Sequence, residues 1–563
     1  MLLKRFALNC FAIAAVLCSA EVNAQQYAGY TLYSVQNSTT TYLMDTASAT
    51  YHTWTHASTK QTGYSSYLTP GGTLWRTVKK SGNSLTGGGM CGEIMKVDYS
   101  GTVLWDYVVS STTECSHHDI CPLPNGNVLM IVYDVKTAAQ ATQAGCQSAI
   151  TMWSEKIIEV QPTGATTGTI VWQWNLWDHL CQDYDASKDN YVSSTADYPE
   201  LWDINANPVK DMWHMNGIDY NPMLDQVTVS AHNADEYYVI DHSTTTAEAA
   251  GHTAGLSGKG GDFLYRWGNP GNYGQSGTTI FNVIHDAHWI PEGCPNEGYL
   301  VALNNKGISN TQSSVDQASP PYSGYNYSYT PNTAYTPSTY TLRHACNGYT
   351  SNMGNSEQYP NGNMLVCLAT AGTIYEINSA GTQLWTFTAS GNVPQAHRYT
   401  SCFINNAAPA QPTITQNGNT LTSSAATTYQ WYLNGVQIPG ATSQNYTAAQ
   451  SGIYLVRITD SNGCVYMYSA NFDFQLSTGL SEVNNIQQIT IYPNPTNGIL
   501  NFKGDFFENG EFEISIYDAY GRLVMQSKNE KSIDMSAFAN GIYHARVRSG
   551  QLGTANRMFS VSR

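Results

Sequence analysis

Residues 117–127 read HHDICPLPNGN and residues 285–293 read HDAHWIPEG, so a histidine–aspartate pair precedes a proline turn twice in the chain. When the two stretches are aligned on the proline, His118 and His285 occupy the same position. A motif that returns at one position with a turn after it indicates a structural repeat, in which each unit presents the same side chain in the same direction.

The same frame recurs more loosely and places Tyr64, His214 and Gly354 at the equivalent position. A sixth element, which lacks the turn, contains His397 and Arg398. Equivalent positions in a closed array of repeats converge on its axis. We therefore expect histidines from distant parts of the sequence to gather there.

A second repeat lies between these motifs: an alternating strand, a turn and a strand that ends in tryptophan, at residues 93–105, 157–172, 237–267 and 373–385. Together with the proline hairpins, each unit has about four strands, which is typical of a β-propeller blade. Six inner-strand positions predict an all-β, six-bladed β-propeller over residues 25–405.

Composition limits the partners of this protein. The chain has 563 residues, of which 12% are charged, and a formal net charge of −16. Its length predicts several domains. Its acidity argues against nucleic acid as a partner, because binding the phosphate backbone needs a basic face. After the N-terminus no run approaches the roughly 20 apolar residues of a membrane helix, so we expect no transmembrane helix.

Residues 1–24 have the features of a secretory signal peptide, with basic residues, an apolar run and a small-residue cleavage site. Export permits disulfides, and the closest candidate pair is Cys115 and Cys121. After a linker, residues 408–480 contain short strands and predict an Ig-like β-sandwich with Trp431 in its core. Cys464 has no partner within that segment.

The C-terminal segment contains IYPNPT at 491–496, YDAYGR at 517–522 and NGIY at 540–543. These motifs resemble the C-terminal sorting domain of the Bacteroidetes type IX secretion system, over residues 485–563. The resemblance implies a small β-sandwich that is recognised by the type IX secretion machinery. It also implies export through the periplasm and outer membrane, removal of the domain, and a secreted or cell-surface product.

The stretches DMWHMNGIDYNP at 211–222, HDAHWIP at 285–291 and YPNGN at 359–363 resemble the arylsulfate sulfotransferase family, over about residues 60–400. The resemblance implies a six-bladed propeller that moves a sulfuryl group from an aryl sulfate donor to a phenolic acceptor. In this family the group passes through a sulfated histidine, without a nucleotide sulfate donor, so no cofactor is expected. The essential residues are several histidines and an arginine around the axis.

His214 and His285 match the family's histidine motifs. Lys306 stands where the family commonly has an arginine, and Gly354 stands where a further histidine is expected. His397 and Arg398 are candidates to supply the missing nucleophile and cation.

His118, at the position equivalent to His285, completes the candidate catalytic set. Imidazole suits the reaction because it is a nucleophile when neutral and an acid when protonated. For the aromatic ring of a substrate, the candidate binding residues are Tyr64, Trp213, Trp289, His232 and His288.

Other functions remain open at this stage. His118 and Asp119 could serve only to satisfy buried strand ends. A non-catalytic surface-binding propeller is one alternative. A metallohydrolase with His118, His214 and His285 as ligands is another, since three imidazoles and a water form a known zinc arrangement.

Overall fold

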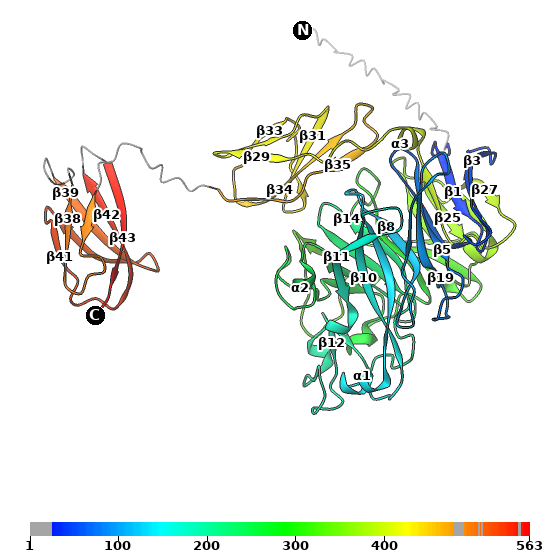
Figure 1. Ribbon diagram of the computed structural model, residues 1–563, viewed down its shortest axis with the longest axis horizontal. Helices are drawn as coiled ribbons and strands as arrows, with labels where there is room; N and C mark the ends of the chain where they lie inside the picture. Colours follow the sequence, from blue (N-terminus) through cyan, green and yellow to red (C-terminus); the bar gives the residue numbers. More distant parts are fainter. Residues whose placement is uncertain (1–24, 477–488, 505–506, 508–510, 550–552) are drawn as a thin grey trace, which may run out of the picture. The chain divides into compact units, whose positions relative to one another are not determined.

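The computed structural model describes residues 25–476, 489–504, 507, 511–549 and 553–563. Within these ranges the chain is almost entirely antiparallel β-structure (Figure 1). It divides into two compact units, Met1–Gln475 and Leu476–Arg563. The signal peptide predicted at residues 1–24 lies outside the described residues, as do residues 485–488 at the start of the predicted sorting domain.

The described part of the first unit contains six four-stranded sheets, which are the blades of the predicted propeller. Blade 1 has β4 (Thr62–Thr69), β5 (Thr73–Lys79), β6 (Gly92–Val97) and β7 (Val103–Val108). Blade 2 has β8 (Glu114–Pro122), β9 (Val128–Lys136), β10 (Met152–Pro162) and β11 (Gly168–Asn175). Blade 3 has β14 (Met215–Asn221), β15 (Gln226–Ala231), β16 (Glu236–Asp241) and β17 (Tyr265–Trp267).

Blade 4 has β18 (Ile284–Trp289), β19 (Leu300–Ser309), β20 (Gln312–Ala318) and β23 (Leu342–Ala345). Blade 5 has β24 (Asn355–Gln358), β25 (Met364–Leu368), β26 (Thr373–Ile377) and β27 (Gln383–Thr388). Blade 6 combines β28 (Ala396–Tyr399) with β1 (Tyr30–Ser34), β2 (Thr40–Met44) and β3 (Thr50–Thr55). The first-named strand of each blade contacts the first strands of its neighbours, so these six strands line the axis.

Blade 6 closes the ring, because its innermost strand comes from the C-terminal end of the propeller and its other strands from the N-terminal end. Strands β28 and β1 pair antiparallel, with His397 opposite Leu32. This pairing satisfies the backbone groups of both strands and leaves no open edge between the first and last repeats.

Tryptophan indoles connect neighbouring blades. In five blades an indole N–H on the outermost strand donates to an oxygen of the next blade at 2.6–3.1 Å. The donors are Trp54, Trp105, Trp172, Trp267 and Trp385. The tryptophan that recurs at the end of the sequence repeat therefore packs in the core and also joins adjacent repeats.

Short elements lie in the connections between strands. The helices are α1 (Ala138–Gln143), η1 (Leu176–Asp178), η2 (Thr195–Asp197), α2 (Thr246–Ala249), η3 (Pro270–Tyr273), η4 (Ala369–Ala371) and α3 (Ser401–Asn405). The additional strands are β12 (Leu180–Cys181), β13 (Trp202–Asp203), β21 (Tyr322–Ser323) and β22 (Asn326–Tyr327).

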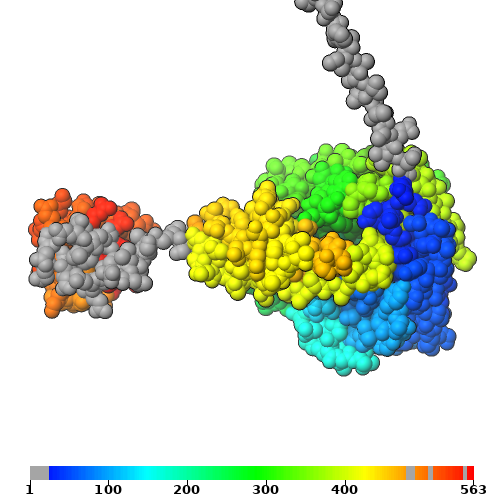
Figure 2. All heavy atoms as spheres, turned by 90° about the horizontal axis from the view of Figure 1, so that it is seen from above, coloured from blue at the N-terminus to red at the C-terminus, as the bar shows by residue number. Residues whose placement is uncertain are grey.

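Two further sheets of the first unit follow the propeller and pack around Trp431, whose side chain is fully buried. One has β29 (Ile414–Asn417), β30 (Thr420–Ser423) and β33 (Asn445–Thr447). The other has β31 (Thr428–Leu433), β32 (Val436–Gln437), β34 (Gly452–Thr459), β35 (Tyr466–Tyr468) and β36 (Phe472–Phe474). Figure 2 shows this yellow and orange sandwich against the propeller, where Arg457 forms an ion pair with Glu292 at 2.5 Å.

The disulfide prediction was wrong. Cys115 and Cys121 are free thiols, whereas Cys402 and Cys464 form a disulfide with a Cα–Cα distance of 6.0 Å. The two predicted partners lie on the same strand, β8, six residues apart, which separates their Cα atoms by about 20 Å in extended chain. A disulfide needs Cα atoms within about 7 Å. The observed bond instead joins the end of the propeller to the sandwich.

The second unit is a smaller pair of sheets. One has β37 (Thr490–Tyr492), β38 (Ile499–Lys503) and β41 (Ser532–Asp534). The other has β39 (Phe512–Asp518), β40 (Leu523–Lys528), β42 (Gly541–Ser549) and β43 (Gly553–Val561). Alternating apolar residues such as Ile514 and Ile516 fill the core between them.

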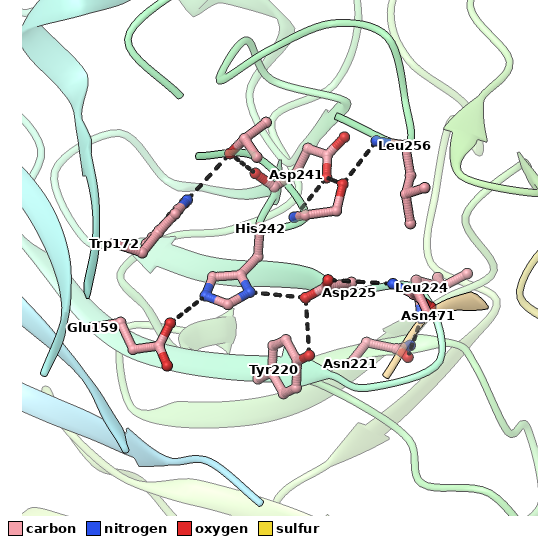
Figure 3. Close-up of polar contacts among 12 residues, drawn as sticks. Glu159, Trp172, Tyr220, Asn221, Leu224, Asp225, Asp241, His242, Leu256 and Asn471 are labelled. Atoms are coloured by element: carbon pink, nitrogen blue, oxygen red, sulfur yellow. Dashed lines mark hydrogen bonds and ion pairs between the residues drawn. The ribbon is translucent and has the colours of Figure 1, made fainter. Parts of the chain in front are cut away.

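A charged cluster joins blades 2 and 3 (Figure 3). The two ring nitrogens of His242, which follows β16, bond Asp225 at 2.8 Å and Glu159 of β10 at 3.1 Å. Because both partners are carboxylates, the ring must donate from both nitrogens and carry a positive charge. Burial alone would lower the pKa of His242, but its bonds to Asp225 and Glu159 outweigh burial and raise the pKa from 6.5 to about 9.

This cluster makes the stability of the propeller depend on pH. The folded-state pKa of His242 lies above its unfolded value, so its contribution is complete below about pH 6.5 and is lost as pH rises through 9. We expect His242→Gln to lower the free energy of unfolding by roughly 2 kcal/mol at pH 6. The difference between wild type and variant in thermal unfolding should shrink towards pH 9.5. A difference that does not change between these pH values would contradict the charged state assigned to His242.

Candidate active site

Four imidazoles form an arc at the axis of the propeller. His118 is on β8, His214 directly precedes β14, His232 directly follows β15 and His285 is on β18. The ring centroids of His118 and His214 are 4.7 Å apart, those of His214 and His232 are 5.3 Å apart, and those of His232 and His285 are 5.5 Å apart. The repeat positions thus bring together histidines from three blades.

Two of these four histidines have an unusual backbone conformation. His118 has a φ of 49° and His214 a φ of 58°, in the left-handed region that L-residues seldom adopt. Strain of this kind costs about 1–3 kcal/mol at each residue and is concentrated at functional sites. Here it aims both rings into the arc.

A chain of hydrogen bonds supports His118 from behind. Its Nδ1 is 2.9 Å from Nδ1 of His117, whose Nε2 is 2.8 Å from the carboxylate of Glu155. All three side chains are buried, and the ring of His117 stacks on Tyr133. His118 Nε2 has no hydrogen-bond partner among the described residues. Burial, and then the neighbouring histidines, hold the pKa of His118 well below 6.5, so the ring is neutral.

Burial also raises the pKa of Glu155 well above 4.5, with a further increase from Asp211. Two proton arrangements are therefore available to the chain Glu155–His117–His118. With Glu155 protonated, the bonds run outward and His118 Nε2 carries a hydrogen; with Glu155 ionised, they run inward and His118 Nε2 has a lone pair. The first arrangement becomes the second when His118 Nε2 gives up its hydrogen and two protons shift along the hydrogen bonds, from Glu155 to His117 and from His117 to His118.

His214 is held differently, by a carboxylate beside it. Its Nδ1 is 2.6 Å from Asp211 Oδ2 and 2.8 Å from the hydroxyl of Tyr133, and this hydroxyl donates to the same carboxylate at 3.2 Å. Nδ1 therefore carries the hydrogen, and Nε2 is the acceptor nitrogen of the neutral ring. Within the described residues no group bonds Nε2. The side chain keeps 15% of its surface exposed, which leaves this nitrogen accessible.

His285 has no free nitrogen. Its Nδ1 is 2.7 Å from Asn305 Oδ1, and its Nε2 accepts the backbone N–H of Met353 at 3.1 Å. The amide of Asn305 in turn donates to two carbonyl oxygens, of Thr350 and Met353. His285 is thus a buried neutral ring that fixes the loop before β24, and burial is the largest cause of its lowered pKa.

A cation lies beside the arc. Lys306 is on β19, one residue after Asn305, the partner of His285. Burial and His214 lower the pKa of His232, and the positive charge of Lys306 makes a smaller contribution in the same direction. His232 Nδ1 bonds Asn233 at 2.7 Å. In the part of the chain that the structure describes, the ammonium of Lys306 has no ion pair, so its charge is available to an anion.

The other predicted residues lie in a second group around the axis. The ring of Tyr64 is 5.0 Å from that of His118, and its buried hydroxyl has no hydrogen-bond partner among the residues that the structure describes. His397 bonds Glu357 at 2.7 Å and packs on Tyr67, and within the same described ranges its buried Nε2 has no partner either. His288 is paired with Asp286 at 3.1 Å.

Three predicted residues point into the protein instead. Arg398, on β28 of blade 6, forms a fully buried ion pair with Glu376 on β26 of blade 5, next to Trp385 of the same blade. Trp213 is fully buried and stacks on Tyr238, and Trp289 is 6% exposed within the core between blades 3 and 4. None of these side chains is placed to contact a ligand of the imidazole arc.

The sequence analysis missed a glycine loop that covers the arc. A Cβ on Gly89 would lie 2.0 Å from Cε1 of His118, and a Cβ on Gly88 would lie 3.2 Å from Cε1 of His214. Only glycine permits this approach of backbone to ring. Three successive glycines at 87–89 were the available signal. His117, Glu155 and Asp211 were also missed. Glu155 reaches His117 from another strand, whereas Asp211 is only three residues before its partner His214 and His117 is adjacent to His118.

A hollow of about 660 Å³ lies beside this loop. Its lining includes Leu85, Thr86, Trp153 and Lys210, and the ammonium of Lys210 lies 4.0 Å from the centre of the Trp153 ring. The four histidines do not line it, but Lys210 directly precedes Asp211, the partner of His214. The hollow thus presents an apolar wall and a cation next to the arc.

Comparison with known proteins gives a family for most of the chain. The family described as arylsulfotransferase (ASST) matches residues 20–404. The secretion system C-terminal sorting domain matches residues 490–560. None of the curated proteins compared with the chain matches it.

Several solved structures are similar in fold. A protein of unknown function from Bacteroides caccae is 11% identical with a TM-score of 0.38, and the alignment covers 66% of this chain and 98% of that one. A periplasmic gluconolactonase from Pseudomonas aeruginosa is 11% identical with a TM-score of 0.34, covering 66% and 99%.

The sorting domain indicates export to the cell surface or secretion. Among the described residues, no helix is both long and apolar enough to cross a membrane. The family match covers more than half of the chain, agrees with the six blades and includes all four histidines of the arc. The chain belongs to the arylsulfotransferase family.

Proposed function

We propose that the protein transfers a sulfuryl group from an aryl sulfate to a phenol through a covalent intermediate on His214. The observation that carries this proposal is the pair His118 and His214: two rings 4.7 Å apart, each with one nitrogen held by a separate support and one nitrogen free. Family membership supports a sulfotransferase activity, and the geometry supports these particular roles.

His214 is the better nucleophile of the two. Asp211 accepts its Nδ1 hydrogen, which fixes the tautomer and stabilises the positive charge that develops when Nε2 attacks. In the first step the bond from Nε2 to sulfur forms while the bond from sulfur to the aryl oxygen breaks. The transferring group carries negative charge on its oxygens, for which Lys306 is the nearby unpaired cation.

His118 acts in this scheme as acid and then as base. With Glu155 protonated, His118 Nε2 donates its hydrogen to the departing phenolate. A proton then moves from His117 Nδ1 to His118 Nδ1, and another moves from Glu155 to His117 Nε2, which leaves Glu155 ionised. In the second step the acceptor phenol attacks sulfur, the nitrogen–sulfur bond breaks, and the phenol proton returns along the same path. The raised pKa of Glu155 suits a group that must hold a proton at neutral pH.

The activity itself is tested with purified protein, a chromogenic aryl sulfate and an added phenol. We expect release of the chromogenic phenol to depend on the acceptor, with ping-pong kinetics, and donor alone should add the mass of one SO₃ group to the protein. Hydrolysis that needs no phenol and is abolished by a chelator would favour the metallohydrolase. Absence of turnover with several donors would favour a binding protein.

The two histidines should differ in their dependence on the leaving group. His214→Ala should lower turnover at least about a hundredfold for every donor and prevent labelling by SO₃. His118→Gln should retain most activity towards an aryl sulfate whose phenol is acidic, and lose at least about a hundredfold towards one whose phenol is weakly acidic. His285→Gln should affect stability more than the bond-breaking step. Equal losses with both donors in His118→Gln would contradict its role as acid.

The glycine loop offers a test that removes no functional group. Gly89→Ala should lower turnover at least about tenfold, since the added Cβ would overlap the ring of His118 and move it from its position beside His214. Gly82→Ala is the matched control, because Gly82 also has a positive φ of 76° but has nothing within 4 Å of its Cβ position. Similar activity in the two variants would mean that the position of His118 is not important for transfer.

A further inference from the structure

A second histidine cluster lies away from the axis, between the insertions of blades 2 and 3. It contains His179, just after η1, and His252 and Asp262, which are both in the connection from β16 to β17. Nδ1 of each histidine is 2.8 Å from the same oxygen, Oδ1 of Asp262. His179 is fully buried, whereas the side chain of His252 is 59% exposed, so the cluster is open to solvent on one side only.

The position of the hydrogen on His179 can be assigned. Its Nε2 is 2.8 Å from the backbone oxygen of Ala249, which can only accept, so Nε2 carries a hydrogen. The ring stacks parallel to Trp174, with centroids 5.5 Å apart, which holds its orientation. In the neutral ring Nδ1 is then a lone pair, and this lone pair points at a carboxylate oxygen.

The lone pair of His179 Nδ1 and the carboxylate oxygen of Asp262 would repel each other at 2.8 Å, unless a positive charge lies between or beside them. A proton on His179 would supply it, and so would a metal ion. The second arrangement accounts for more of the geometry, because a metal-bound histidine commonly donates its other N–H to a backbone carbonyl, as His179 does to Ala249. It also explains why His252 and His179 direct the same ring nitrogen to the same oxygen.

We propose that His179, His252 and Asp262 form a binding site for a Zn²⁺ ion, with Nδ1, Nδ1 and Oδ1 as ligands and water in the fourth position. The three ligand atoms lie within 4.8 Å of one another, and tetrahedral zinc needs separations of about 3.3 Å. To hold the ion, the two 2.8 Å contacts between Nδ1 and Oδ1 would open by about half an ångström, and the two Nδ1 atoms, which are within 4.8 Å of each other, would take up the same separation. Two imidazoles and one carboxylate suit zinc and disfavour Ca²⁺ and Mg²⁺, which prefer oxygen ligands throughout.

The ion would join two blades. His179 belongs to the segment that leaves β11 of blade 2, and His252 and Asp262 belong to blade 3, where α2 packs against β11 (Figure 1). The backbone oxygen of Glu200 accepts the N–H of Phe263, the residue after Asp262, at 3.0 Å, so Glu200 lies beside the segment that carries one of the ligands. The location of the cluster outside the imidazole arc makes the site structural, and binding should stabilise the folded protein without changing the transfer reaction.

The test uses the full chain without a histidine tag, stripped of metal with a chelator and titrated with Zn²⁺ alone. We expect one ion per chain by calorimetry and by elemental analysis, and a rise in the melting temperature that depends on zinc concentration. His252→Ala and Asp262→Asn should each weaken binding at least tenfold (roughly the effect of losing one ligand) and reduce the thermal shift. The exposed position of His252 makes its substitution the safer of the two for folding.

Two control variants make the result specific. His344→Ala removes a partly buried histidine on the outer strand of blade 4, whose Nε2 contacts Tyr375 and no carboxylate, and should bind zinc like the wild type. His214→Ala removes a ring of the axial arc and should also bind normally. Zinc binding that survives in His252→Ala, that is lost in His214→Ala, or that is absent from the wild type would overturn the proposal. Loss of transfer activity alone would bear only on the proposed function.

Discussion

Closure of the ring is the constraint on which the rest of the structure depends. Strand β28 carries His397 and pairs with β1, more than 360 residues away in the chain, and only this pairing makes the last repeat a neighbour of the first. A closed ring fixes the distance of every inner strand from the axis, so side chains at equivalent repeat positions must converge. The tryptophan N–H groups that connect successive blades hold the same spacing at the periphery. The imidazole arc is therefore a consequence of closure.

The convergence of the inner strands buries polar side chains around the axis, and the charge of each side chain then depends on the groups beside it. His118 is buried among other imidazoles and stays neutral, whereas His242 lies between two carboxylates and is charged to about pH 9. The same residue type thus serves as a neutral reactive group at the axis and as a cationic link between blades. Glu155 shows the corresponding effect for a carboxyl group, since burial favours its protonated form. These differences are what a proton transfer along Glu155, His117 and His118 requires.

Much of the fold could be predicted from sequence, because the number of residues between the inner-strand position and the following proline turn is the same in most of the repeats. This spacing correctly predicted that His118 and His285 lie on inner strands, and His214 directly precedes one. Arg398 points away from the axis because adjacent strand residues face opposite sides, so the neighbour of an axial residue enters the contact between blades and there meets Glu376 of blade 5. The chain of hydrogen bonds behind His118 could not be predicted, since Glu155 bonds His117 from another strand. The disulfide joins residues 62 apart, in segments with no local signal for contact.

Gly354 shows why the reaction in this chain must be assigned from its own geometry. The resemblance to the family leads one to expect a histidine at this repeat position, but Gly354 has a φ of 101°, and a Cβ there would lie 2.5 Å from the backbone oxygen of Cys367. No side chain fits without moving blade 5. The preceding residue, Met353, instead donates its N–H to Nε2 of His285 and occupies that nitrogen. Among the described residues, free imidazole nitrogens of the arc then remain at His118, His214 and His232, and of these three only His214 has its tautomer fixed by a neighbouring carboxylate. The glycine at position 354 and the occupied nitrogen of His285 are therefore both consistent with the proposal that His214 is the nucleophile.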